Sequence, residues 1–230
     1  MIAILAAAAA LVAAPSPSPS PSPPPPSPIV VVAKYRAALK ALHEPRVFTV
    51  EYTLVQTGTR TLEQSHRIFR SGADERDETL AVNGTRSTSP VVRIFRRRPY
   101  RYTVTALAPK PADYDFAYVG PHRDGKHVDY VFTVSPKKPK RGITFTQVSI
   151  DGVSFLPEWV AFAADQHAGR GIVTFGKSDR YWVARSAAAQ AGVPGGVAHE
   201  RLAFAKWRFP KTLPRSTFEA ARPLPPVPPA

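Results

Sequence analysis

Hydrophobic and polar positions change their spacing once along this chain, close to Pro45. Residues 29–43 carry apolar side chains at helical intervals, and their lysines and arginines lie off that stripe. This spacing predicts an amphipathic helix that ends before the proline. From residue 47 onward the period is two, as in VFTVEYTLVQT, where apolar residues from Phe48 to Leu54 alternate with polar ones. Such alternation is typical of strands that bury one face.

The rest of the chain contains about ten such strands, joined mainly by short turns, which favours sequential antiparallel pairing. One helix cannot cover both faces of so many strands. Several strands, such as the one in 154–162, are also apolar on both faces. We therefore expect an α+β fold that is mainly antiparallel β: a sheet of about ten strands curled into an open half-barrel, with an N-terminal helix.

Local signals add four expectations. Asp151-Gly152 predicts a tight hairpin turn with positive φ. Pro157, which follows soon after, cannot donate to a sheet ladder and belongs at an edge, a strand start or a bulge. Residues 91–109 fit one long or broken strand. The alanine-rich stretch 187–196 fits a loop, or one short helical turn.

Both ends of the chain have low-complexity sequences that lie outside this domain. Residues 1–14 are apolar and uncharged, too short to span a bilayer, and fit a signal peptide or a short apolar anchor. Residues 15–28 form a Pro/Ser-rich linker, and residues 223–230 a Pro-rich disordered tail. The half-barrel domain is thus expected over residues 29–222, in a periplasmic or otherwise extracytoplasmic location.

The absence of cysteine and the high positive charge limit which functions the protein can have. The chain of 230 residues has no cysteine, which excludes disulfides, thiolate zinc sites, a cysteine nucleophile and a lipidated cysteine. Its formal net charge of +14 favours anionic partners. Because we expect the protein to be exported, we expect its anionic partner to be a membrane surface and not a nucleic acid.

The sequence contains only weak matches to nucleotide-binding, metal-binding and catalytic motifs. Residues 171–178 match the phosphate-loop pattern GxxxxGK[ST], but Ile, Val, Thr and Phe at the variable positions favour an extended strand. His122 and His127 flank one turn and could meet across it, although a solvated hairpin end explains them as well. Asp113 and Asp115 lie two apart and could pair as acid and base in a hydrolase. We expect no catalytic residues, no metal and no cofactor.

The hairpin around Ile150-Asp151 and Leu156-Pro157 resembles the late hairpin of the bacterial outer-membrane lipoprotein carrier family, the LolA/LolB-like proteins. GRGIVTFGKSDRYW (169–182) resembles the strand that follows it there, and the Arg98-Pro99 step before Tyr100 and Tyr102 resembles an earlier segment. The similarity spans roughly residues 30–218. It implies an apolar concave cavity that holds acyl chains and carries them between membranes.

The first hypothesis is a non-enzymatic carrier or binding protein for an acyl chain or lipoprotein lipid. We expect it to be a monomer whose basic loops contact the membrane, with no nucleic-acid partner. Its expected ligand-binding residues come from the most regular strands: Val50, Tyr52, Leu54, Tyr100, Tyr102, Val104, Tyr130, Phe132 and Trp159. Its expected membrane contacts are Arg93, Arg96, Arg97, Arg98, Arg101, Lys137, Lys138, Lys140 and Arg141. The alternative is an envelope interaction or sensor module with a filled core that acts through its basic surface.

Overall fold

The computed structural model describes residues 26–58, 60–88, 91–97, 103–125, 127–165 and 168–219. Its elements in chain order are α1 (Pro28–Ala41), β1 (Val47–Thr57), β2 (Leu62–Ser71), β3 (Asp74–Val82), β4 (Thr85–Arg86), β5 (Val92–Phe95), α2 (Val104–Leu107), β6 (Tyr114–Asp124), β7 (His127–Pro136), β8 (Ile143–Asp151), β9 (Pro157–Ala164), β10 (Gly169–Ser178), β11 (Tyr181–Val193), β12 (Gly196–Arg208) and the short 3-10 helix η2 (Arg215–Phe218). None of the helices in these described ranges is both long and apolar enough to cross a membrane.

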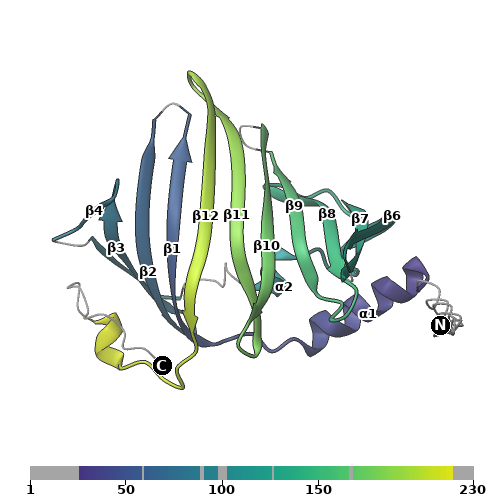
Figure 1. Cartoon of the computed structure of the whole chain (residues 1–230), viewed down its shortest axis with the longest axis horizontal. Coiled ribbons are helices and arrows are strands. Elements are labelled where there is room, and N and C mark those ends of the chain that lie inside the picture. The colour runs from purple at the N-terminus through teal and green to yellow at the C-terminus, as the bar shows by residue number, and fades with distance from the viewer. Residues whose placement is uncertain are drawn as a thin grey trace, which may run out of the picture.

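The strands form one antiparallel 12-stranded sheet in the order β4-β3-β2-β1-β12-β11-β10-β9-β8-β7-β6, with β5 also paired to β3. Because β1 pairs with β12, the first and last long strands meet in the middle of the sheet, and β6 lies at one end (Figure 1). The sheet curls without closing. The expected open half-barrel with an N-terminal helix is confirmed.

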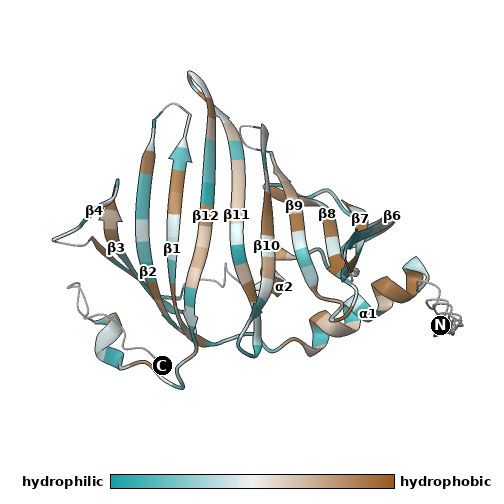
Figure 2. Ribbon diagram, viewed as in Figure 1, coloured by the Kyte–Doolittle hydropathy of each residue, from teal (hydrophilic) through white to brown (hydrophobic). Residues whose placement is uncertain are grey.

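The two faces of the sheet follow from register, since residues directly opposite in an antiparallel pair share a face. Tyr52 lies opposite Phe204, and Phe132 lies opposite Val148. We call the face that carries these residues, and that α1 and α2 cover, the inner face. Figure 2 shows hydrophobic and hydrophilic residues alternating along many strands, as a period of two predicts.

The main hydrophobic core lies between the helices and the inner face of β6 to β11. Its buried residues are Val31, Tyr35, Val104, Ala108, Tyr114, Tyr130, Phe132, Val134, Val148, Ile150, Val160, Val173, Phe175 and Ala184. Within it the hydroxyl of Tyr35 donates a 2.9 Å hydrogen bond to the carbonyl of Pro109, which ties α1 to the segment after α2. Phe48 and Val50 of β1 and Ile68 of β2 form a second buried hydrophobic cluster.

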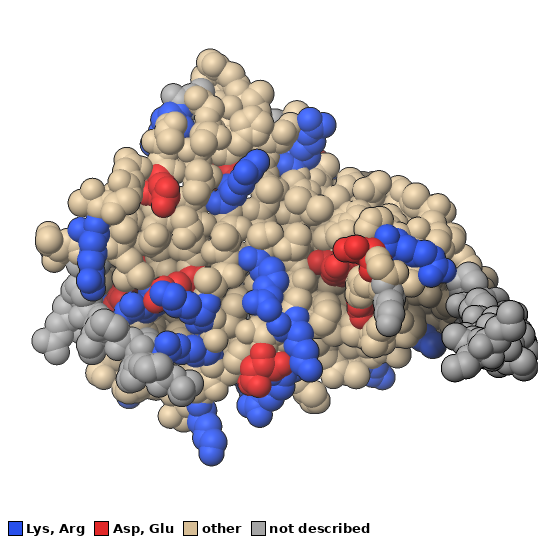
Figure 3. Space-filling model, viewed as in Figure 1, with Lys and Arg blue, Asp and Glu red and all other residues tan. Residues whose placement is uncertain are grey.

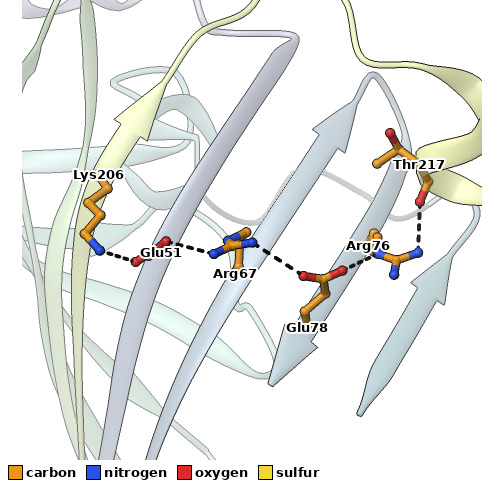
Figure 4. Close-up of polar contacts among 6 residues, drawn as sticks. All are labelled: Glu51, Arg67, Arg76, Glu78, Lys206 and Thr217. Carbon is orange, nitrogen blue, oxygen red and sulfur yellow. Dashed lines mark hydrogen bonds and ion pairs between the residues drawn. The ribbon is translucent and has the colours of Figure 1, made fainter. Parts of the chain in front are cut away.

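The outer face carries a row of alternating charges across four strands, which we call the charge ladder. It runs through Lys206, Glu51, Arg67, Glu78 and Arg76, and ends at the carbonyl of Thr217 next to η2 (Figure 4). Its Arg76 end is buried, and Thr217 and Phe218 are buried beside it. The ladder thus fastens the C-terminal segment onto the outer face of β3.

The hairpin after β8 differs from the expected tight turn. Five residues separate Asp151 from Pro157, and positive φ occurs at Phe155 (55°) rather than at Gly152. A glycine is needed at 152 because an added Cβ would lie 2.3 Å from the carbonyl oxygen of Val128. Pro157 does begin a strand, and it lies next to an irregularity in the β8–β9 register, as expected.

Two segment predictions were wrong. Residues 91–109 contain β5 and then the short helix α2 instead of one strand, while Arg98, Tyr100, Arg101 and Tyr102 lie outside the described residues. Most of the alanine-rich stretch 187–196 belongs to β11, because it pairs with β10 on one side and with β12 on the other. Tertiary pairing here overrides the weak strand propensity of alanine.

Candidate functional site

A groove runs beside α1 where the helix faces β6 and β7. Its larger hollow measures about 390 Å³ and has an apolar floor of Val32 from α1, Tyr114 and Phe116 from β6, and Phe132 from β7. Phe116 packs edge-on against Phe132 at a centroid distance of 5.9 Å. This apolar floor could accept a hydrocarbon segment.

The groove forms because of how α1 sits on the sheet. Val31 and Tyr35 point into the core and are fully buried, which turns Val32 and Ala33 toward β6. Ile29 in the first turn stays 82% exposed beside the hollow.

A second hollow of about 280 Å³ continues along α1 and shares Arg36 and Pro111 with the first. Leu39, Thr105 and Ala112 also line it. We call the two hollows together the α1 groove. Pockets of roughly 300–1,000 Å³ with mostly apolar walls are typical of small-ligand sites.

Four cations line the α1 groove: Arg36, Lys40, Lys110 and Lys137. The Nζ atom of Lys137 donates a 2.9 Å hydrogen bond to the carbonyl of Pro111 and lies 4.0 Å from Asp115. In the loop after β7, Lys140 lies over the ring of Tyr114, 4.5 Å from its centroid. An apolar floor with a cationic rim suits a ligand that has a hydrocarbon part and an anionic head.

The expected ligand-binding residues do not converge on one cavity. Among those that the structure describes, Phe132 lines the α1 groove and Val104 lies in α2. Val50, Tyr52, Leu54 and Tyr130 also lie on the inner face, whereas Trp159 lies opposite Ser149 on the outer face. Tyr100 and Tyr102 lie outside the described residues.

Sequence reasoning missed the groove residues on α1 and in the segment before β6. The helical stripe predicted that α1 covers the sheet, but nothing in it indicated which strands would leave a gap beside Val32. Pro111 and Tyr114 lie more than seventy residues away in the chain. Their proximity depends on where α1 crosses the sheet.

The predicted membrane-contact residues form two separate groups. Arg93, Arg96 and Arg97 lie in or just after β5, at the β3 end of the strand order, while Arg98 and Arg101 lie outside the described residues. Lys137, Lys138, Lys140 and Arg141 are exposed in the loop between β7 and β8, near the other end. Of the two groups, the second borders the α1 groove.

Arg96 also has a structural role. It forms a 3.1 Å ion pair with Asp74 and donates a 2.6 Å hydrogen bond to the carbonyl of Phe218. It therefore helps to hold the C-terminal segment in place. Figure 3 shows further Lys and Arg side chains spread over the face turned to the viewer, with Asp and Glu among them.

Another hollow, of about 640 Å³, lies on the outer face of β1, β12, β11 and β10. Thr57, His199, Gln190 and Arg170 form one register row across these strands and line it. Because much of this lining is polar or charged, the hollow suits a hydrocarbon chain less well than the α1 groove does.

Three further motifs were candidates in the sequence: the phosphate-loop pattern, the pair Asp113 and Asp115, and the pair His122 and His127. The phosphate-loop pattern at 171–178 lies within β10, as its apolar residues predicted. Asp113 is exposed just before β6, and Asp115 lies 4.0 Å from Lys137 at the groove. His127 forms ion-pair contacts with Asp129 and Asp151 on the outer face, and His122 lies opposite Asp129 in the β6–β7 register.

No protein-family model and no curated protein matches the chain. Solved structures with a similar fold include a LolA superfamily protein from Nitrosomonas europaea, with 10% identity and a TM-score of 0.45 over 83% of this chain and 96% of that one. A DUF1329 family protein from Desulfovibrio piger has 10% identity and a TM-score of 0.49 over 84% and 98%. A putative outer membrane lipoprotein-sorting protein domain from Vibrio parahaemolyticus has 16% identity and a TM-score of 0.45 over 81% and 94%.

Proposed function

We propose that this protein is a non-enzymatic, extracytoplasmic carrier or binding protein for an acyl chain or lipoprotein lipid. The α1 groove holds the hydrocarbon part of the ligand. The basic loop after β7 contacts anionic membrane surfaces. The observation that carries the proposal is the apolar floor of Val32, Phe116 and Phe132 beneath the cationic rim.

The physical basis is the transfer of hydrocarbon out of water. Burial contributes about 0.8 kcal/mol per CH₂ group, so a segment of eight carbons gains roughly 6 kcal/mol if it is fully covered. Arg36 and Lys137 then lie where the anionic head of such a ligand would emerge. Lys138, Lys140 and Arg141 extend the positive charge toward a membrane, where each basic residue contributes about 1 kcal/mol.

The proposed ligand site differs in place from the one expected from the sequence. The inner face of β6 to β11 is packed against α1 and α2, so core side chains fill much of the curve. The groove beside the helix offers the open apolar space instead. A ligand with a longer chain would require α1 to move aside, as a lid does.

The packed core also favours the alternative, an envelope interaction or sensor module that acts through its basic surface. The two proposals differ in what the α1 groove does. A carrier takes up lipid there, whereas an interaction module leaves the groove without lipid and depends on the arginines and lysines alone.

Native mass spectrometry of the full chain, purified gently from the cell envelope, tests the carrier proposal. A carrier should show mass adducts that organic extraction removes, and the extract should contain acyl chains. The emptied protein should then take up an apolar fluorescent dye. Protein without adducts that also takes up no dye would contradict the proposal and leave the interaction module.

A further inference from the structure

Four side chains with metal-ligating atoms converge on the outer face at the ends of three strands. His127 and Asp129 come from the start of β7, Asp151 from the end of β8, and Glu158 from the start of β9. The Nε2 atom of His127 lies 2.8 Å from Asp129 Oδ1, 3.4 Å from Asp151 Oδ2 and 3.9 Å from Glu158 Oε1. Figure 3 shows a group of acidic side chains over this part of the sheet.

The buried carboxylates of this cluster form no ion pair with a lysine or arginine among the described residues. The side chains of Asp129 and Asp151 are only 3% and 9% exposed. Although the protein has a net charge of +14, no Lys or Arg in the described part of the chain forms an ion pair with Asp129, Asp151 or Glu158. Buried charges in proteins are either paired or bound to a metal ion, and His127 alone faces three carboxylates here.

One oxygen atom of the cluster, Asp129 Oδ1, is buried, and no donor among the described residues forms a hydrogen bond to it. His127 Nε2 lies at ion-pair distance, but the two atoms are not aligned as a hydrogen bond. Two atoms that each bind one Zn²⁺ ion at about 2.1 Å in tetrahedral geometry lie about 3.4 Å apart. The 3.4 Å separation of His127 Nε2 from Asp151 Oδ2 matches this value, and Asp129 Oδ1, at 2.8 Å, would move slightly away from His127 to bind the same ion.

The hairpin after β8 holds Asp151 in position for such a site. Its Oδ1 atom accepts hydrogen bonds from the backbone N–H groups of Val153, at 3.2 Å, and Ser154. Its Oδ2 atom remains turned toward His127. Asp129 and Asp151 are also direct neighbours in the β7–β8 register. Two strands and one turn therefore orient the three atoms before any ion binds.

We propose that His127, Asp129 and Asp151 bind one divalent transition-metal ion, with Zn²⁺ as its best match, and that Glu158 supplies a further oxygen ligand. Imidazole nitrogen favours Zn²⁺ and its neighbours over Ca²⁺, which takes six to eight oxygen ligands. The ion would join the ends of β7, β8 and β9. Because the site lies on the outer face, it is independent of the α1 groove and of the function proposed there.

Isothermal titration of the full chain tests the site. The protein is treated with EDTA, dialysed and titrated at neutral pH with ZnCl₂, and separately with CaCl₂. We expect one Zn²⁺ per chain, and Zn²⁺ should raise the temperature of unfolding. His127→Gln should weaken binding by more than about tenfold and abolish the thermal shift.

Matched variants make the outcome decisive. His199→Gln removes an exposed histidine of β12 and should bind Zn²⁺ like the original chain. Asp151→Asn keeps an oxygen that can cap the turn but loses the charge, and it should weaken binding as His127→Gln does. His127 is 41% exposed, so its variant should fold, which circular dichroism verifies. Failure of the original chain to bind Zn²⁺, or equal binding by the original chain and His127→Gln, would overturn the proposal.

Discussion

Arg76 and Glu78 form a buried ion pair on the outer face of β3, with Nε of Arg76 2.8 Å from Oε1 of Glu78 and side chains that are 0% and 1% exposed. Two residues apart on one strand, they lie on the same face. Oε2 of Glu78 also lies 3.9 Å from Arg67, and Arg76 donates a 3.1 Å hydrogen bond to the carbonyl of Thr217. This pair therefore connects the strand to the C-terminal segment.

Glu78→Gln should lower the free energy of unfolding by about 3–5 kcal/mol, because it removes the negative charge that lies 2.8 Å from the buried guanidinium of Arg76. Urea denaturation followed by circular dichroism measures the loss. Glu51→Gln is the matched control within the charge ladder. Glu51 is 28% exposed, its closer partner Lys206 is 66% exposed, and its other partner Arg67 keeps Glu78, so the change should cost less than about 1 kcal/mol. Equal losses in the two variants would contradict the view that burial sets the cost.

Ala33→Trp should block the α1 groove. Ala33 lines the larger hollow and is exposed, so an indole there fills the space without disturbing the core. We expect uptake of an apolar dye or fatty acid to fall by about tenfold, which corresponds to roughly 1.4 kcal/mol. Fluorescence titration measures it.

The control for that variant is Ala37→Trp on the same helix. Ala37 is also exposed but lines neither hollow of the α1 groove. It should bind the ligand like the original chain. A parallel fall in both variants would mean that tryptophan disturbs α1 itself and that the groove is not the site.

Arg36→Gln combined with Lys137→Gln should weaken binding of an anionic ligand more than binding of a neutral one. Each cation is expected to contribute about 1 kcal/mol, or roughly fivefold in affinity, by analogy with basic residues at anionic surfaces. A fluorescent fatty acid and its methyl ester, titrated at low and high salt, separate the two effects. Added salt should reduce the preference for the acid in the original chain, because salt screens exposed charges. If the original chain bound the fatty acid and its methyl ester with equal affinity, the cationic rim would have no role in binding the anionic head.

Gly152→Ala should destabilise the hairpin between β8 and β9. The added Cβ would lie 2.3 Å from the carbonyl oxygen of Val128, where backbone has to move. We expect a loss of about 1–3 kcal/mol in the free energy of unfolding, measured by urea denaturation. Val153→Ala in the same loop changes an exposed side chain and should cost less than about 0.5 kcal/mol. An unchanged stability of Gly152→Ala would show that the turn tolerates the shift.

Sequence periodicity was sufficient for the elements that bury one regular face. The apolar positions of β1 and β7 fell on the inner face, and the helix before Pro45 formed over Pro28–Ala41. The phosphate-loop pattern was recognised as a strand because its apolar residues favour extended backbone. These predictions succeeded since each depends on side chains only a few residues apart.

Elsewhere local signals were not enough. The alanine-rich part of β11 forms a strand because β10 and β12 pair with it. At β12, Lys206 has a φ of 52° beside a register shift, so Phe204 and Trp207 pack together although simple alternation separates them. A bulge of one residue reverses every face beyond it.

The sequence by itself determined a curled antiparallel sheet with one covering helix, because the period of two, the helical stripe and the turn residues are local properties of the chain. Only the tertiary structure decided where the open space lies and which charged groups meet. Val32 reaches Phe116 and Phe132 across the α1 groove, and His127 reaches Asp151, because strand register and helix position bring distant segments together. Those contacts depend on the packing of the whole sheet, which no short stretch of sequence specifies.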